Sequence, residues 1–412
     1  MTAAERPSSD DGDEDGASAL RRVRAALLAT GATEAEIDDA LANGVIDLLT
    51  LDHLLVPAAR RYSIRALSER TGVALELLRR LWRALGFLDV DDDAVAFTDL
   101  DLVAVEQFST LLQIGSADVD TGLQMARVIG QSMARIAEAE LVAGVMSVSA
   151  EPGSVEAAAD AVRLADTWAP TMASLIEFAW RRHLQAATRH MMLLRSHGMR
   201  GGASPTMVVG FADMVGFTLL SQHLDSVDLA AVVRRFEEIS HDLVTSLGGR
   251  VVKMIGDEAM FVVDDVVAAA RIGLGLAEAY ADDDLLSDVR VGMAIGPVLV
   301  SDGDYYGPPV NLASRIVKIA NPGTVLVSDE FHQLLERESN GEFSGQPLKP
   351  RTLKDLGTLQ LWWCGRPGEV VDGTGRRSDR RRHRRWERLS NVGRSPSASP
   401  LGDAGGGDAE GA

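Results

Sequence analysis

Hydrophobic positions recur with two different periods along this chain. Residues 18–195 are rich in Ala, Leu and Arg, with apolar residues at helical spacing and few runs of β-branched residues. Capping signals such as TEAE, which begins at Thr33, mark helix starts in this half. A Gly- and Pro-containing break, GMRGGASP, covers residues 198–205, and strands then alternate with helices. The pattern predicts an all-helical domain over 18–197, a linker over 198–205 and an α+β domain over 206–366.

The second half predicts a βαββαβ order, which is that of a ferredoxin-like fold. An apolar strand at residues 207–212 precedes a helix over 227–247. Two short strands, RVVKMI and EAMFVV, flank Gly256-Asp257 in a tight hairpin, and a helix over 265–281 leads to the strand VRVGMAIGPVLV. Further elements are expected after this unit: a helix bearing residues 310–319, a strand at 324–327, a short helix at 329–336 and a final strand around 358–364.

Length and composition narrow the class of protein. The 412 residues have room for two or three domains, each with its own core. Residues 1–17 are acidic, unlike a signal peptide, and we expect a disordered leader there. No apolar run reaches the roughly eighteen residues of a membrane helix, and a single cysteine, Cys364, fits a reducing compartment. We therefore expect a cytoplasmic protein with no transmembrane segment.

Charge argues against nucleic acid as a stable partner. The net charge is -19, whereas binding to phosphate backbones depends on Lys and Arg. Residues 367–412 contain the exception, RRSDRRRHRRWER, which has eight arginines. Its surroundings of Gly, Ser and Pro favour a disordered tail. The alternative is contact of this tail with an anionic surface, whether lipid, nucleic acid or an acidic patch of the same protein.

Three blocks in the second half carry polar groups suited to a nucleoside triphosphate. They are FADMVGFT at residues 211–218, KMIGD at 253–257 and DYYGPPVNLASR at 304–315. Their order and side-chain types resemble the catalytic core of class III nucleotidyl cyclases. The resemblance implies a ferredoxin-like cyclase domain in which a ribose 3′-hydroxyl attacks the α-phosphate and pyrophosphate leaves. The helical half would then be a regulatory domain.

Asp213 and Asp257 are the expected metal ligands. Asp213 leaves the end of an apolar strand and Asp257 lies in a hairpin turn, and a ferredoxin-like sheet makes these two positions neighbours. The attack builds charge on the entering and leaving oxygens, and two divalent cations, Mg or Mn, answer that need. The family uses these two positions for its metals.

The remaining site residues follow from the resemblance. Lys253 and Asp304 match the purine-recognition pair: Lys donates to adenine N1 and Asp accepts from the 6-amino group, which implies ATP, with GTP as the alternative substrate. In the family, the Asn at the position of Asn311 orients the ribose, and the Arg at the position of Arg315 stabilises the pentavalent phosphorus. These two lie four apart on one predicted helix, and a guanidinium offers a rigid fork of donors to phosphate oxygens. Lys354 is the nearest candidate for the β- and γ-phosphates.

The site residues form two groups, the metal ligands and the nucleotide-binding residues, and together they imply a homodimer. Lys253 and Asp257 are four residues apart, roughly 13 Å in an extended strand, so they are not expected to serve the same nucleotide. The family resolves this by pairing head to tail, with metal ligands from one subunit and the purine pair, Asn and Arg from the other. Seven residues separate Gly296 from Asp304, which predicts a short arm around the partner, typical of a bacterial subclass.

The helical half leaves a DNA-binding alternative open. Residues 62–90 have the look of a helix-turn-helix and loosely resemble regulators of the mercury-resistance type. Between positions 62 and 115, however, five arginines face nine acidic residues, a poor electrostatic footprint for DNA. We favour a helical packing module, with a DNA-binding regulator as the alternative. A silent, nucleotide-sensing cyclase-like module is a further alternative, although the metal aspartates and the arginine are all present.

Three histidines precede the second half. His183 and His190 lie seven apart on a helix predicted over residues 174–195, and His197 follows in the linker. Each can change charge between about pH 5 and 8 and so bias the position of this helix. The chain is similar to mycobacterial adenylate cyclases with an autoinhibitory helical domain, some of which respond to acid. We expect the N-terminal domain to restrain the catalytic dimer and acid to relieve the restraint; the alternative is that it only aids dimerisation.

Overall fold

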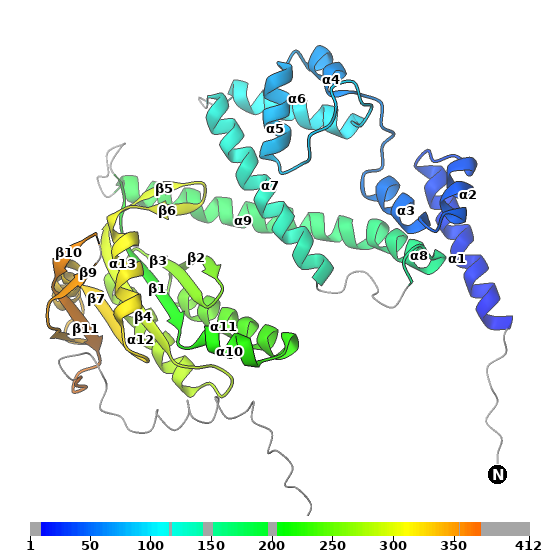
Figure 1. Cartoon of the computed structure of the whole chain (residues 1–412). Helices are drawn as coiled ribbons and strands as arrows, with labels where there is room; N and C mark the ends of the chain where they lie inside the picture. Colours follow the sequence, from blue (N-terminus) through cyan, green and yellow to red (C-terminus); the bar gives the residue numbers. More distant parts are fainter. Residues whose placement is uncertain (1–9, 115–117, 143–150, 197–203, 354, 372–412) are drawn as a thin grey trace, which may run out of the picture. The chain divides into compact units, whose positions relative to one another are not determined.

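The computed structural model describes residues 10–114, 118–142, 151–196, 204–353 and 355–371. The chain divides into two compact units, Met1–Gly201 and Gly202–Ala412, whose elements are labelled in Figure 1. No helix among the described residues is long and apolar enough to cross a membrane.

The described part of the first unit is helical. Its elements, in chain order, are α1 (Asp10–Ala29), α2 (Glu34–Ala42), α3 (Ile46–Leu55), α4 (Ile64–Thr71), α5 (Leu75–Ala84), α6 (Asp99–Ile114), α7 (Val119–Val142), α8 (Val155–Arg163), a π-helical turn (Leu164–Trp168) and α9 (Ala169–Ser196).

Helix starts in this unit confirm one expectation and modify another. Thr33 forms the predicted capping box with Glu36, in which each side chain binds the other residue's backbone N–H. In contrast, α1 begins at Asp10, inside the segment expected to be a disordered leader.

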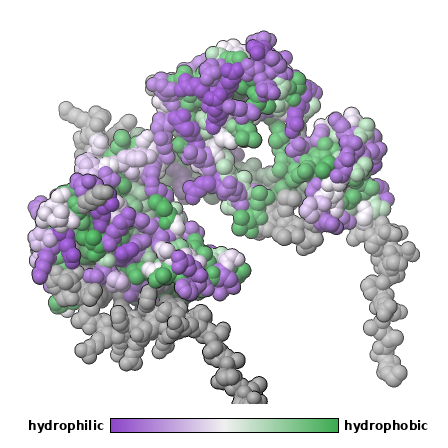
Figure 2. Space-filling view, in the orientation of Figure 1, coloured by the Kyte–Doolittle hydropathy of each residue, from purple (hydrophilic) through white to green (hydrophobic). Residues whose placement is uncertain are grey.

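The first unit has separate small cores. One gathers residues of α1, α2, α3 and α8 around Val23, Leu27 and Ile37. Another gathers Ile64, Leu67 and Leu78 of α4 and α5 with Phe97. Much of α9 is exposed despite its apolar stripe; its exposed large apolar residues include Leu175, Phe178, Trp180, Leu184 and Met191. Figure 2 shows such hydrophobic residues among hydrophilic ones on the surface.

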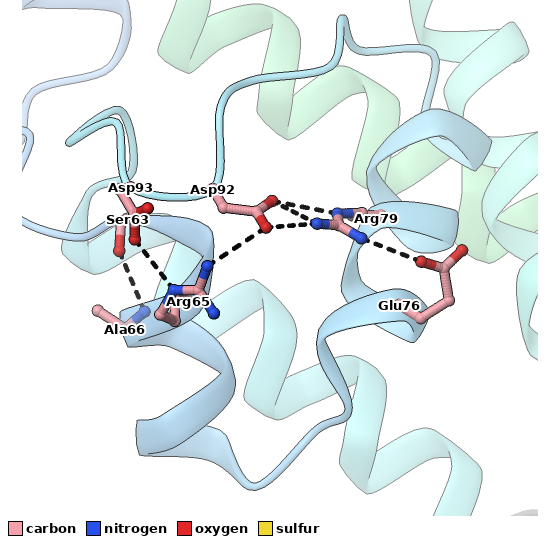
Figure 3. Close-up of polar contacts among 7 residues, drawn as sticks. All are labelled: Ser63, Arg65, Ala66, Glu76, Arg79, Asp92 and Asp93. Carbon is pink, nitrogen blue, oxygen red and sulfur yellow. Dashed lines mark hydrogen bonds and ion pairs between the residues drawn. The ribbon is translucent and has the colours of Figure 1, made fainter.

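Helices α4 and α5 form the predicted helix-turn-helix, with Gly72 in the left-handed conformation at its turn. An acidic loop, residues 89–93, closes over it (Figure 3). Asp92 accepts from Arg79 of α5 at 2.5 and 2.6 Å and pairs with Arg65 of α4 at 3.5 Å. The Arg79 guanidinium holds the pKa of Asp92 below its ordinary value.

Each arginine of this helix-turn-helix has a partner within the unit. Besides the two that bind Asp92, Arg70 lies over the ring of Tyr62, Arg80 pairs with Asp120 and Arg83 pairs with Asp89. These guanidinium groups are therefore engaged by the chain's own side chains. The arrangement favours the packing module over DNA binding, in line with the charge balance of the sequence.

The second unit is an α+β domain. Its elements, in chain order, are β1 (Thr206–Met214), α10 (Phe217–His223), α11 (Ser226–Ser246), β2 (Arg250–Ile255), β3 (Glu258–Val263), α12 (Val266–Asp282), β4 (Val289–Pro297), β5 (Leu299–Ser301), β6 (Asp304–Tyr306), α13 (Pro308–Ile319), β7 (Val325–Ser328), α14 (Asp329–Glu338), β8 (Ser344–Pro347), β9 (Arg351–Leu353), β10 (Gly357–Leu359) and β11 (Leu361–Gly365).

A seven-stranded sheet organises this unit in the order β2-β3-β1-β4-β7-β11-β8. The first four strands are antiparallel neighbours and have the order expected of a ferredoxin-like βαββαβ unit. The strand β7 extends the sheet by pairing with β4 in parallel. The fold predicted from the sequence is confirmed for this half.

Helices cover both faces of the sheet (Figure 1). One face packs on α11, α12 and α14, with Phe236, Leu276 and Phe331 in the core. The other packs on α13, whose Ala313 and Val317 meet the odd-numbered residues of β1. A β-carbon on Gly292 would come within 2.3 Å of the backbone nitrogen of Val317, so a glycine is required where α13 crosses β4. The close crossing fixes α13 against the strands that carry the candidate site.

The strand expected over residues 289–300 is divided in two. β4 ends at Pro297, and Leu299 begins a separate hairpin of β5 and β6. Proline lacks the N–H that a continuing ladder needs, which accounts for the interruption. The hairpin is short, as predicted for the arm. The short elements α10, β8 and β9 were not expected from the sequence pattern, and the final strand expected around 358–364 is divided into β10 and β11.

Candidate active site

Asp213 lies near the end of β1, on the sheet face covered by α13. Its side chain is nearly buried, and it stands directly opposite Glu258 of β3 on one side and Arg290 of β4 on the other. Residues directly opposite in antiparallel strands point to the same face, so these three form one row across the sheet. Oδ2 of Asp213 accepts a hydrogen bond from Arg290 Nε at 2.6 Å, and Nη2 of the same guanidinium lies 2.5 Å from this oxygen as an ion pair.

Asp257 lies in the turn between β2 and β3, beside the end of β1. The backbone N–H of Met214 donates to the carbonyl oxygen of Asp257 at 2.9 Å, which fastens the turn to the strand that carries Asp213. Burial raises the pKa of Asp257, and the charge of Asp213 raises it further. Burial also raises the pKa of Glu258, again with a contribution from Asp213. Three carboxyl groups, those of Asp213, Asp257 and Glu258, are therefore gathered at this corner.

The donor set at this corner suits a hard divalent cation. Carboxylate oxygens are the ligands that Mg²⁺ and Mn²⁺ prefer. The Arg290 guanidinium, bound to a nearly buried carboxylate, shows that the position accommodates positive charge. No group of three or more metal-ligating side chains occurs among the described residues. A cation here would thus need further oxygen ligands from outside this set of side chains.

Lys253 and Asp304 are brought together from β2 and β6. Nζ of Lys253 binds Oδ2 of Asp304, while Oδ1 of Asp304 accepts from the backbone N–H of Tyr305 at 2.8 Å. Both side chains are partly exposed. A cationic donor and a carboxylate acceptor therefore stand next to each other and are accessible to a ligand.

Asn311 and Arg315 lie on α13, as predicted, and are one turn apart on it. Pro308 and Pro309 begin this helix after Gly307, whose φ of 136° only glycine adopts readily. Asn311 is exposed and Arg315 is half-buried. Arg315 forms no ion pair with the residues that the structure describes.

The remaining predicted residues are three histidines and Lys354. His183 lies on α9 and is exposed. His190 is on the same helix, with its side chain outside the described part, and His197 and Lys354 lie outside the described residues. The structure therefore leaves the roles of these four residues as predictions.

Arg290 and Glu258 are the site residues that sequence reasoning missed. No local motif marks either one, because their place in the site comes from strand register. Glu258 directly follows Asp257, and Arg290 is the second residue of the predicted strand VRVGMAIGPVLV. Antiparallel pairing of the start of that strand with the end of β1 places Arg290 opposite Asp213.

Comparison with known families agrees with these two units. Residues 202–364 match the family described as adenylate and guanylate cyclase catalytic domain, and residues 11–192 match the adenylate cyclase regulatory domain. The second unit is thus a class III nucleotidyl cyclase domain. A protein named adenylate cyclase from Streptomyces coelicolor is 33% identical over 345 residues, 76% of this chain and 88% of that protein. The chain belongs to the adenylate cyclase family.

Two other known proteins are also similar to this chain. A protein named pH-sensitive adenylate cyclase from Mycobacterium tuberculosis is 31% identical over 337 residues, which is 80% of this chain and 84% of that protein. Among solved structures, the catalytic core of a rhodopsin-guanylyl cyclase of converted specificity, in complex with ATPαS, is 25% identical with a TM-score of 0.37, covering 40% of this chain and 97% of that one.

Proposed function

We propose that this enzyme converts ATP to 3′,5′-cyclic AMP and pyrophosphate. The observation that carries the choice of substrate is the contact between Lys253 and Asp304. Adenine offers an acceptor at N1 and donors at its 6-amino group, so an ammonium and a carboxylate held side by side complement it. Guanine presents the reverse pattern at these positions, which disfavours GTP.

The chemistry would be performed by groups at the end of β1, in the turn between β2 and β3, and on α13. Asp213 and Asp257 would hold two divalent cations, Mg or Mn, which when bound supply charge for the 3′-hydroxyl and the phosphates. Asn311 would orient the ribose, and Arg315 would bind the equatorial oxygens of the α-phosphate as charge develops. Arg290 is placed to bind phosphate oxygens when cations occupy its carboxylate partner.

A homodimer with two shared sites would unite the metal ligands with the nucleotide-binding residues. The support is that Asn311 is exposed and Arg315 has no ion-pair partner among the described residues, so both can reach a nucleotide held by a second copy. Each chain would contribute metal ligands to one site and the Lys253–Asp304 pair with α13 to the other. A monomer would then be inactive.

The helical unit would regulate this dimer. The family match over residues 11–192 is to a regulatory domain, and the sequence similarity extends to a relative named as pH-sensitive. We propose that the unit restrains the catalytic dimer at neutral pH and that protonation of His183, His190 and His197 relieves the restraint.

The decisive test is incubation of the full chain with ATP and Mn²⁺ or Mg²⁺, assayed for cyclic AMP and pyrophosphate. Asp213→Ala and Arg315→Ala should each abolish product formation. Mixing the two variants should restore up to one intact site per heterodimer, because the lesions then fall in the same site. A wild-type chain that makes no cyclic AMP with either metal would contradict the proposal, and failed complementation would contradict the shared sites.

A further inference from the structure

The two strands that carry Lys253 and Asp304 touch at a second point. The guanidinium carbon of Arg250, on β2, lies 5.2 Å from the ring centroid of Tyr305, on β6. Tyr305 directly follows Asp304, and its backbone N–H already donates to the Asp304 carboxylate. The strand β6 is therefore held to β2 by two adjacent contacts, one ionic and one between a cation and an aromatic ring.

A β-bulge makes this double contact possible. Arg250 stands opposite Val262 of β3, and Lys253 stands opposite Met260, with a register shift between Val251 and Lys253. In a regular strand, residues three apart point to opposite faces. The extra residue in the bulge places Arg250 and Lys253 opposite two β3 residues that share a face, so both point toward β6. Bulges commonly re-aim side chains beside active sites in this way.

Tyr305 is the part of the arm that is anchored in the domain. Its side chain is 4% exposed and belongs to the core beside α13, whereas Leu299, Val300 and Tyr306 of the same hairpin are 48% or more exposed. The hairpin turns at Asp302 and Gly303, and each of its strands has only three residues. The direction of the Asp304 carboxylate therefore depends on how firmly the ring of Tyr305 is seated.

We propose that Arg250 is a positioning residue for purine recognition. By covering the Tyr305 ring, it holds β6 in the register that keeps Asp304 against Lys253. Arg250 does not itself contact the base. The inference rests on the proposed function, in which Lys253 and Asp304 read adenine, and it adds that the specificity of this pair depends on a third side chain brought to the same face by the bulge.

The test is the kinetics of the full chain with ATP and with GTP at saturating Mn²⁺. Arg250→Gln removes the cation and should raise the KM for ATP by about three- to tenfold, with kcat changed less than about twofold, since a cation over a ring is a modest interaction. The preference for ATP over GTP should fall by a similar factor. Arg250→Lys should stay near wild type, because an ammonium also binds a ring face. Arg337→Gln, an exposed arginine at the end of α14, is the matched control.

Several outcomes separate this inference from the proposed function. A wild-type chain that makes no cyclic AMP removes both. If cyclic AMP is made but Lys253→Met leaves the ATP-to-GTP preference unchanged, the purine pair is wrong and the inference falls with it. If Lys253→Met shifts the preference and Arg250→Gln does not, the inference alone is overturned. A lower Tm for Arg250→Gln with unchanged KM and preference would show a merely structural role, which also overturns it.

Discussion

Arg290 binds Asp213 through two guanidinium nitrogens on a single carboxylate oxygen, across the pairing of β4 with β1. The carboxylate expected to hold a metal is thus already neutralised by the chain's own cation. A divalent ion at this carboxylate would compete with the guanidinium, and a released guanidinium would be free to bind an anion. We therefore expect metal binding and phosphate binding to be coupled through this one arginine.

Arg290→Gln should therefore separate metal binding from substrate binding. Without a competing cation, Asp213 should bind Mn²⁺ in the absence of nucleotide about threefold tighter or more, measured by electron paramagnetic resonance. The KM for ATP should rise about tenfold or more, as expected for a lost hydrogen bond to a charged group of roughly 1.5 to 3 kcal/mol. Arg271→Gln, which breaks the exposed pair with Glu342, is the control. Weaker Mn²⁺ binding in Arg290→Gln would show that the guanidinium supports the site and does not compete for it.

Two neighbouring aspartates of the acidic loop, Asp92 and Asp93, should contribute unequally to the stability of the helical unit. Asp92 bridges α4 and α5 with 26% of its side chain exposed, whereas Asp93 is 83% exposed and, within the part of the chain that the structure describes, pairs with Arg65 alone (Figure 3). Asp92→Asn should lower the Tm of this unit by several degrees, and Asp93→Asn should change it little, because exposed pairs contribute little to stability. Thermal unfolding followed by circular dichroism measures both, and the difference should shrink in about 1 M salt. Equal effects of the two variants would argue against the bridging role.

Local sequence signals predicted most of the helices and strands, but they could not predict contacts that depend on how the strands pair. Periodicity and turn residues placed β2, β3 and the helices α11, α12, α13 and α14 within a few residues, because each depends on sequence neighbours. The Asp213–Arg290 pair joins residues 77 positions apart, and such a contact depends on which strands pair. The bulge at Val252 could not be predicted from the sequence for a similar reason, because a bulge exists only relative to the partner strand, here β3.

The residues of the candidate site likewise fall into those that local motifs indicated and those that only strand pairing brings together. Asp257, Asn311 and the Lys253–Asp304 pair were found because they lie in contiguous blocks that resemble a family. Glu258 and Arg290 were missed because only the sheet brings them to Asp213. The end of β4 at Pro297 could have been anticipated, because proline lacks the backbone N–H that a continuing strand needs. The helix that begins at Asp10 could not, because the composition of this segment indicates disorder.

His332 should make the stability of the catalytic unit depend on pH. Its ring is buried against Trp362, with ring centroids 3.7 Å apart, and the Trp362 N–H donates to Asp329. Burial lowers the pKa of His332 below its ordinary value, although Glu336 and Asp329 partly offset this. The unfolded chain therefore takes up the proton at a higher pH than the folded chain does.

The free energy of unfolding should consequently fall as pH drops through about 6.5, the ordinary pKa of histidine. It should stop falling once the folded state is protonated as well. Urea unfolding followed by tryptophan fluorescence at a series of pH values measures the slope. His332→Phe keeps a ring against Trp362 and removes the proton, so it should flatten the slope in this window. The exposed His241 provides the control, since His241→Gln should leave the slope unchanged.

Removal of the helical unit should reveal its effect on catalysis. A chain that begins near Gly201 retains the whole sheet and the site residues of the second unit. If the unit restrains the dimer, this chain should make cyclic AMP faster than the full chain at neutral pH, with a flatter pH profile. If the unit only aids dimerisation, the same truncation should lower activity, and adding protein should restore it by mass action. Equal rates and profiles for the two chains would rule out restraint.

The histidines before the catalytic domain can then be tested in the full chain. His183→Gln, His190→Gln and His197→Gln combined should remove the rise in activity on acidification, because no group of this set would gain charge between about pH 5 and 8. Activity at neutral pH should stay at the restrained level. His223→Gln, which alters an exposed histidine of α10, should leave the profile unchanged. A triple variant that still responds to acid would show that the pH sensor lies elsewhere. The proposal that the helical unit restrains catalysis would still hold if the truncated chain were more active than the full chain.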